Sequence, residues 1–188
     1  MTAAEYVAFE LAAEARHEFH DGHIYAMSGA SRAHNMIAGN IYMRLRAAAR
    51  GGACRVSIEG VRFALPSGLH YYPDVMVACE PAPDDTHVET APCVVVEVLS
   101  PSTQGVDIGL KLPQYRTAPS LTAVVIVRQS RRWVELHRRN PDGTWTVSDH
   151  IGAGEITFPY PGPPGGPVTM TLDEIYEDVT LVPPAEEA

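Results

Sequence analysis

The segment from Cys93 to Ser100 is the feature that most constrains the fold. It is an apolar, largely β-branched run, Cys-Val-Val-Val-Glu-Val-Leu-Ser, with one carboxylate, Glu97, in its middle. A run of this length and composition is typical of a strand that is buried on both faces of a sheet. A carboxylate buried in such a strand costs several kcal/mol unless a cation or hydrogen-bond donors lie beside it. The sequence therefore predicts a central strand in which Glu97 has a polar or positive partner.

A second predicted strand, residues 71–79, carries another acidic residue, Asp74. Because one loop separates the two strands, we expect them to be neighbours in the sheet. Two carboxylates on neighbouring strands form a hard oxygen site that suits Mg²⁺ or Mn²⁺, with water in the remaining positions. The carbonyl of Val98 is a further candidate ligand. The alternative is structural: an Asp at the start of a strand is commonly structural, and Glu97 could simply pair with an arginine.

Lys111 is the single lysine among fourteen basic residues, the other thirteen of which are arginine. Lysine is a compact point charge on a flexible stem, and its pKa shifts readily, whereas the guanidinium of arginine is planar and always charged. We therefore expect Lys111 to lie where a guanidinium would not serve, close to the acidic central strand. The alternative is that one surface lysine remained by chance. A lysine beside two metal-binding carboxylates could orient a water molecule or stabilise negative charge on a phosphate.

Length and charge exclude several classes of protein. The 188 residues predict one domain over residues 1–182, followed by a frayed acidic tail at 183–188. The net charge of −9 argues against non-specific binding to polyanions. No apolar run approaches the roughly 18 residues of a membrane span, and the first residues do not resemble a signal peptide. Cys54, Cys79 and Cys93 lie in or beside apolar runs, which predicts three buried thiols and a reducing, cytoplasmic location.

The N-terminal third alternates between helices and strands. A capping box at Thr2 predicts a helix to about Ala15, followed by a β-hairpin over residues 16–27 with its turn at Asp21-Gly22. A longer helix is expected over residues 31–50, and an alternating strand over residues 55–65 with a bulge at Gly60. The apolar stripe of the first helix is expected to comprise Tyr6, Phe9, Leu11 and Ala13.

The remaining chain predicts a loop over residues 80–92, a helix containing Lys111 and Tyr115, and a strand over residues 121–128. Pro113 requires that this helix begin near Lys111 or be kinked there, since proline is tolerated only in the first turn. A β-hairpin over residues 132–151 and a helix from Thr171 to about Asp178 complete the prediction, with residues 159–167 irregular.

Two groups of side chains suggest further sites. His17, His20 and His23 crowd the N-terminal hairpin, but residues three apart on a strand face opposite sides, so surface histidines are favoured over a zinc site. Arginines cluster at the end of the helix over residues 31–50 and just after it: Arg44, Arg46, Arg50 and Arg55. Compensation of the helix dipole is favoured over a phosphate-binding patch.

Three strings of residues together resemble the Uma-two family of restriction-endonuclease-like proteins. The first runs from Arg16 to Asn35 and reads RHEFHDGHIYAMSGASRAHN. The second is Tyr-Pro-Asp-Val at residues 72–75, and the third is Val-Glu-Val-Leu-Ser-Pro-Ser-Thr at residues 96–103, with Asp107, Lys111 and Tyr115 after it. The resemblance covers nearly the whole chain, and the third string is specific.

The resemblance implies the PD-(D/E)xK nuclease fold, a mixed α/β architecture in which helices flank a sheet and a metal binds at one end. In that pattern Asp74 and Glu97 take the places of the two acids. Leu99 occupies the position at which this pattern usually has its lysine. Lys111 resembles a replacement for that lysine at a later position in the chain. Glu18 matches a family acid that could reach the same site. Ser102, Thr103 and Asp107 are expected to shape the loop and cap the helix.

The leading functional hypothesis is a Mg²⁺- or Mn²⁺-dependent DNA endonuclease acting as a homodimer, with Asp74, Glu97, Lys111 and Glu18 at its site. The alternative from another class is an interaction module that retains the fold without catalysis, suggested by the acidity of the chain and by Leu99. A zinc protein built on the hairpin histidines is the third possibility.

Overall fold

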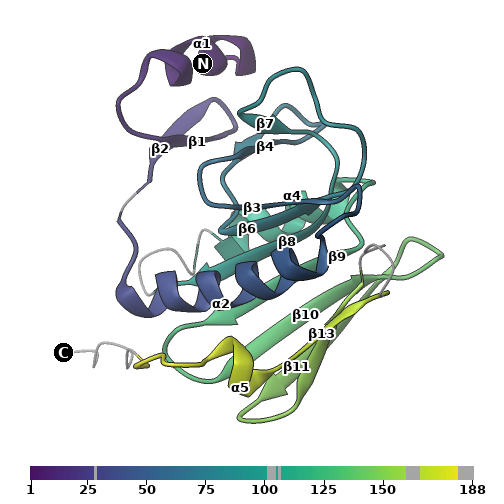
Figure 1. The fold of residues 1–188 in the computed structure, drawn as a ribbon. Coiled ribbons are helices and arrows are strands. Elements are labelled where there is room, and N and C mark those ends of the chain that lie inside the picture. The colour runs from purple at the N-terminus through teal and green to yellow at the C-terminus, as the bar shows by residue number, and fades with distance from the viewer. Residues whose placement is uncertain (28, 101–104, 106, 160–165, 182–188) are drawn as a thin grey trace.

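A six-stranded sheet is the centre of the molecule (Figure 1). The computed structural model describes residues 1–27, 29–100, 105, 107–159 and 166–181. The strand order is β11-β10-β9-β8-β6-β3, with β8 and β9 parallel and the other pairs antiparallel. The strands are β3 (Arg55–Ile58), β6 (Val75–Ala78), β8 (Pro92–Leu99), β9 (Ala123–Arg128), β10 (Trp133–Arg139) and β11 (Trp145–Ile151). Every residue of β8 is buried, which confirms the prediction of a central strand.

Helix α2 (Arg32–Ala48) lies across one face of this sheet (Figure 1). Its buried residues Ile37, Ile41 and Leu45 recur every four positions and pack on Val94, Val96 and other residues of that face. Each of these three side chains contributes about 1.5–3 kcal/mol through burial. The opposite face packs against α4 (Leu112–Thr117) and a second, smaller sheet. None of the described helices is long and apolar enough to span a membrane.

The smaller sheet has the strand order β2-β1-β5-β4-β7. Its strands are β1 (His17–His20), β2 (His23–Ala26), β4 (Arg62–Ala64), β5 (His70–Tyr71) and β7 (Val88–Glu89). The predicted hairpin at Asp21-Gly22 is confirmed, and both turn residues have positive φ, as a type I′ turn requires. Phe63 and Tyr71 from this sheet share a core with Val95 and Ile126 of the six-stranded sheet.

The chain passes between the two sheets at two places where the sequence predicts continuous strands. The expected strand over residues 55–65 is two strands, because Glu59 and Gly60 both have positive φ and turn the chain from β3 into β4. The predicted bulge at Gly60 is therefore wrong. The expected strand over residues 71–79 breaks at Pro73, between β5 and β6. Proline has no N–H for a sheet ladder, so the break falls where the backbone is least able to pair.

The N-terminal helix α1 (Ala3–Ala12) has the predicted capping box between Thr2 and Glu5 but ends before Ala15. Only Tyr6 of its expected apolar stripe is buried; Phe9 and Leu11 are exposed. Tyr6 is the member of the stripe that packs on the small sheet: its ring stacks on Phe19, and its hydroxyl donates to the carbonyl of His17.

The C-terminal region contains a further two-stranded sheet that was not predicted from the sequence. Strands β12 (Glu155–Phe158) and β13 (Val168–Thr171) form a two-stranded sheet whose apolar residues join the core beneath α2. Helix α5 (Leu172–Ile175) starts at the predicted capping box of Thr171 but ends at Ile175, three residues earlier than expected. The proposed tail at 183–188 and most of the irregular stretch at 159–167 lie outside the described residues.

The cysteines differ from the prediction of three thiols. Cys54 and Cys79 form a disulfide, and Cys93 is a buried free cysteine. Strands β3 and β6 are antiparallel with Arg55 opposite Ala78, so the next pair outward places Cys54 directly opposite Cys79. Burial raises the pKa of the Cys93 thiol to about 11, so it stays protonated at neutral pH.

Thiol counting tests this pairing. In denaturant without reductant, we expect one cysteine per chain to react with a maleimide, and all three to react after reduction. Reduction should also lower the free energy of unfolding by about 3 kcal/mol, because the bridge spans 25 residues of sequence. Cys93→Ser is the control and should leave no reactive thiol before reduction. Three reactive thiols in the untreated protein would contradict the disulfide.

His70 in β5 makes the fold sensitive to acid. Its ring is buried beside Tyr6 and Phe19, and burial, together with the nearby charge of Arg62, lowers its pKa to about 4. Because the folded-state pKa lies below the unfolded value of about 6.5, the neutral imidazole stabilises the fold above that value. This stability is lost as the pH falls from about 6.5 towards 4.

We expect the His70 contribution to amount to about 2 kcal/mol between pH 7.5 and pH 4.5. Other groups also titrate in this range, so the measurement is the difference between wild type and His70→Gln in urea denaturation at both pH values. Wild type should lose about 2 kcal/mol more than the variant on acidification. Equal losses in the two proteins would show that His70 does not titrate as described.

Candidate active site

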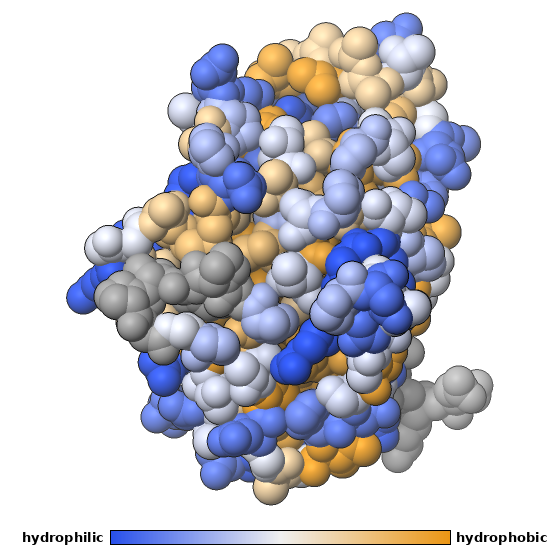
Figure 2. All heavy atoms as spheres, turned by 90° about the vertical axis from the view of Figure 1, so that its right-hand side faces the viewer, coloured by the Kyte–Doolittle hydropathy of each residue, from blue (hydrophilic) through white to orange (hydrophobic). Residues whose placement is uncertain are grey.

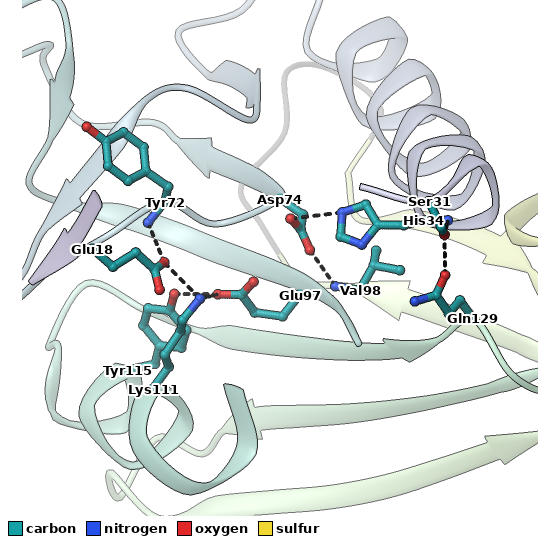
Figure 3. Close-up of polar contacts among 10 residues, drawn as sticks. All are labelled: Glu18, Ser31, His34, Tyr72, Asp74, Glu97, Val98, Lys111, Tyr115 and Gln129. Carbon is teal, nitrogen blue, oxygen red and sulfur yellow. Dashed lines mark hydrogen bonds and ion pairs between the residues drawn. The ribbon is translucent and has the colours of Figure 1, made fainter. Parts of the chain in front are cut away.

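The break at Pro73 places Asp74 where the two sheets meet. Val75 of β6 pairs with Val96 of β8, so the same antiparallel register puts Asp74 opposite Glu97. The prediction that the two acidic strands are neighbours is therefore confirmed. The carboxylate of Asp74 accepts a hydrogen bond from the backbone N–H of Val98 at 2.7 Å, which ties it to β8 (Figure 3).

Lys111 lies between two carboxylates that come from different sheets (Figure 3). Its Nζ is 2.8 Å from Oε1 of Glu18 in β1 and 3.7 Å from Oε1 of Glu97 in β8. All three residues are buried, with 6%, 7% and 2% of their surface exposed for Lys111, Glu18 and Glu97. The single lysine of the chain is therefore an interior charge that compensates two acids, and the closer of the two is Glu18.

The chain reaches this position through an irregular helical turn. Residues Asp107–Lys111 form a π-helical turn, η1, that leads directly into α4, and Pro113 is the second residue of α4. Proline has no N–H for a helix hydrogen bond, and the change from π-helical to α-helical geometry falls just before Pro113, between Lys111 and Leu112. The η1 turn, which is wider than an α-helical turn, ends at Lys111. Single π-helical turns are frequently found at functional sites.

Tyr115 is a site residue whose role the sequence analysis did not assign. Its hydroxyl donates to Oε1 of Glu97 at 2.6 Å, so Glu97 has both a hydroxyl and an ammonium beside the same oxygen. Tyr115 follows Lys111 by four residues, the spacing that places two side chains on one side of a helix. That spacing was visible in the sequence, but the partner of the hydroxyl was not.

The backbone N–H of Tyr72 is a second hydrogen-bond partner of Glu18. Its N–H donates to Oε1 of Glu18 at 3.0 Å, the same oxygen that binds Lys111. The adjacent ring of Tyr71 lies under Lys111, with Nζ 5.9 Å from the ring centroid. Burial raises the pKa of Tyr71, and the negative charge of Glu18 raises it further, so its hydroxyl stays protonated.

His34 in the first turn of α2 binds the other side of Asp74. Its Nε2 is 3.1 Å from Oδ1 of Asp74, while Oδ2 faces the Val98 N–H. The N-cap of α2, Ser31, donates to the side chain of Gln129, which follows β9. Asp74 is thus held from both sides, and the start of α2 is joined to the end of β9.

The donor set suits a hard divalent cation. In their ionised forms, the three carboxylates of Asp74, Glu18 and Glu97 exceed the single ammonium of Lys111, so the cluster carries net negative charge. Mg²⁺ is commonly held by one or two carboxylates and several waters, which Asp74 and Glu97 could provide. Within residues that the structure describes, no three His, Cys, Asp or Glu side chains gather as a metal-binding group.

The zinc alternative finds no support at the hairpin. The three histidines have separate partners: His17 bonds to Glu10, His20 to the Tyr71 hydroxyl, and His23 to the carbonyl of Asp21. The phosphate-binding patch after α2, which the sequence favours less than compensation of the helix dipole, also finds no support at Arg55. Arg55 forms a two-pronged ion pair with Glu89, with both N–O distances at or below 2.9 Å.

A mixed sheet flanked by helices, with acids on adjacent strands and a buried lysine, defines the restriction-endonuclease-like fold class. A crystal structure described as a putative nuclease belonging to DUF820, from Anabaena variabilis ATCC 29413, superimposes with a TM-score of 0.72. The match covers 94% of this chain and 97% of that one at 15% identity, so it concerns the fold.

Sequence comparison identifies the family. The chain belongs to the Uma2 family, whose description is "Putative restriction endonuclease" and which it matches over residues 3–167. Two uncharacterized proteins of Synechocystis sp. (strain ATCC 27184 / PCC 6803 / Kazusa) are similar to it. The protein slr1290 is 33% identical over 183 residues, covering 96% of this chain and 94% of its own length; sll1609 is 32% identical over 165 residues, covering 85% and 93%.

Proposed function

We propose that this protein is a divalent-metal-dependent endonuclease that hydrolyses phosphodiester bonds in DNA. The observation that carries the proposal is the buried Lys111 between Glu18 and Glu97, with Asp74 opposite Glu97 on the neighbouring strand. A structural strand glutamate would need one partner; Glu97 shares the buried Lys111 with a second buried acid, Glu18, at the junction of two sheets. Membership of a family whose description is "Putative restriction endonuclease" supports the same reaction class.

In the proposed mechanism, Asp74 and Glu97 would hold Mg²⁺ or Mn²⁺, and the Val98 carbonyl would be a further ligand. Such an ion lowers the pKa of bound water and offsets negative charge on the phosphate. His34 and the Val98 N–H keep the Asp74 carboxylate in place, and Tyr115 does the same for Glu97. Glu18 positions the ammonium of Lys111, which is suited to orient the attacking water or to stabilise charge that develops on the phosphate.

The proposal includes a homodimer, because two copies related by twofold symmetry can each address one strand of a duplex. Light scattering coupled to size-exclusion chromatography tests it directly, and a monomer at all concentrations would contradict this part. We also propose a cytoplasmic location, because the proposed substrate is DNA. The three thiols predicted from the sequence do not support this location, since Cys54 and Cys79 form a disulfide.

A second candidate function is an interaction module without catalysis. The observation in its favour is that the acids already have partners inside the protein: Asp74 has His34 and the Val98 N–H, and Glu97 has Tyr115 and Lys111. Glu97 is also only 2% exposed. A site closed in this way could persist for the sake of the fold alone.

Cleavage of supercoiled plasmid distinguishes the two functions. Wild type with Mg²⁺ or Mn²⁺ should nick the plasmid, and EDTA should stop the reaction. Asp74→Asn should abolish nicking, because the amide retains the shape and one acceptor but not the charge. Asp84→Asn, an exposed residue in the loop before β7, is the charge-matched control and should cleave like wild type. Metal binding without cleavage of plasmid, short duplex or single strand would favour the interaction module.

A further inference from the structure

The turn between β9 and β10 gathers positive charge in an acidic protein. Three of the thirteen arginines, Arg128, Arg131 and Arg132, lie within five residues, although the whole chain carries a net charge of −9. Arg132 is paired with Asp173 of α5. The Arg131 side chain is exposed and has no ion-pair partner among the described residues. This turn is therefore a local exception to the charge of the molecule.

Two of these guanidinium groups are held over one aromatic ring. Cζ of Arg128 is 3.8 Å and Cζ of Arg131 is 4.8 Å from the centroid of the Trp133 indole. Cation–π contacts of this kind orient arginine side chains without neutralising them. Burial lowers the pKa of Arg128, and the like charge of Arg131 lowers it further, although Glu135 and Asp149 oppose this effect. The guanidinium groups of Arg128 and Arg131 are therefore held close to each other at this turn.

The backbone of the turn is fixed from the other side of the sheet. The hydroxyl of Tyr176 accepts a hydrogen bond from the Trp133 N–H at 3.0 Å and lies 2.8 and 3.1 Å from the carbonyl oxygens of Arg128 and Arg131. Tyr176 itself is buried in the core beneath α2. The arginines therefore project from a rigid turn, which lowers the entropy cost of binding a ligand.

The strand register places this turn beside the candidate active site. Glu97 of β8 is in register with Ile126 of β9, and Leu99 with Arg128. Side chains alternate along a strand, so Arg128 lies on the same face of the sheet as Glu97, about 7 Å further along the strand direction. Gln129 in the same turn binds Ser31 at the start of α2, three residues before His34, the residue that holds Asp74 (Figure 3).

We propose that the β9–β10 turn binds the phosphodiester backbone of the nucleic-acid substrate next to the hydrolysis site, with Arg128 and Arg131 as the phosphate contacts. This inference rests on the proposed nuclease function and names the surface that holds the substrate. Arginine is suited to this role because its planar fork matches two phosphate oxygens. The offset of about 7 Å from Glu97 along the strand direction places the turn close to the proposed hydrolysis site.

The α2 arginines serve as a matched comparison. Arg46 is exposed like Arg131, but it lies near the opposite end of α2 from His34, about 18 Å along the helix. Figure 2 shows the molecule from the side on which α2 ends. Hydrophilic side chains cover much of this face, and smaller hydrophobic areas lie between them. Substituting alanine at either position removes the same charge from an exposed site. Any difference in DNA binding between the two variants is therefore caused by the position of the arginine.

The experiment measures binding of a short fluorescein-labelled DNA duplex by anisotropy, with Ca²⁺ in place of Mg²⁺ to suppress cleavage. Arg131→Ala should weaken binding about five- to tenfold and reduce the slope of log affinity against log salt by about 0.9, the loss of one phosphate contact. Arg131→Glu should weaken binding further. Arg46→Ala should bind like wild type, and circular dichroism should show that all variants are folded.

The outcomes separate this inference from the function on which it rests. If wild type binds DNA and Arg131→Ala binds equally well, the turn is not the contact surface and the nuclease proposal stands. If Arg46→Ala weakens binding and Arg131→Ala does not, the phosphates lie at the far end of α2 and the inference is overturned. If wild type does not bind duplex or single-stranded DNA, the proposed function fails and the inference fails with it.

Discussion

Replacement of Lys111 by methionine is expected to lower the free energy of unfolding by about 3–5 kcal/mol. The substitution keeps a flexible apolar stem of similar length but removes the ammonium that lies 2.8 Å from Glu18 and 3.7 Å from Glu97. Both carboxylates are buried and would lose their cation. Urea denaturation at neutral pH in the presence of EDTA measures the change without contribution from a bound metal.

Two further variants show whether the loss has this cause. Glu18→Gln combined with Lys111→Met removes both charges of the closest pair, and we expect it to recover much of the lost stability, since a neutral amide is cheaper to bury than an unpaired carboxylate. Lys111→Arg keeps the charge but forces a larger group into a site that is 6% exposed, so a loss of about 1–3 kcal/mol is expected. A change below about 1 kcal/mol for Lys111→Met would contradict an interior ion pair.

Glu97→Gln is expected to reduce Mg²⁺-dependent cleavage at least about 100-fold while leaving the protein folded. The amide oxygen can still accept from the Tyr115 hydroxyl, so the local packing is preserved. The lost negative charge removes one of the two carboxylates proposed to hold the ion, and ions of this kind supply several kcal/mol of charge stabilisation. Plasmid nicking rates over a range of Mg²⁺ and Mn²⁺ concentrations provide the measurement.

Glu89→Gln is the matched control for this prediction. Glu89 is also a strand glutamate of low exposure with a cationic partner, Arg55, but it belongs to β7 in the small sheet. We expect this variant to lose stability and to retain wild-type cleavage. If Glu97→Gln cleaves DNA at the wild-type rate, Glu97 does not hold the ion. If Glu89→Gln and Glu97→Gln are equally inactive, the activity loss reflects stability and not the site.

The elements predicted correctly are those whose pattern is local. The buried run of β8, the four-residue spacing in α2, the turn at Asp21-Gly22 and the capping boxes at Thr2 and Thr171 depend on neighbouring residues, and the structure has each of them. The wrong predictions concern which strands pair with each other. Residues 55–65 alternate as one strand would, but alternation is the same whether the two halves pair in one sheet or in two.

The sequence by itself determined the central strand, the two acids on neighbouring strands and the exceptional status of Lys111, because composition, spacing and rarity are properties of the chain. Only the tertiary structure decided that Lys111 is closer to Glu18 than to Glu97, that Tyr115 and His34 bind the two strand acids, and that Cys54 pairs with Cys79. These contacts join segments that are far apart in the chain. They depend on where two sheets meet and on strand register, which no local pattern encodes.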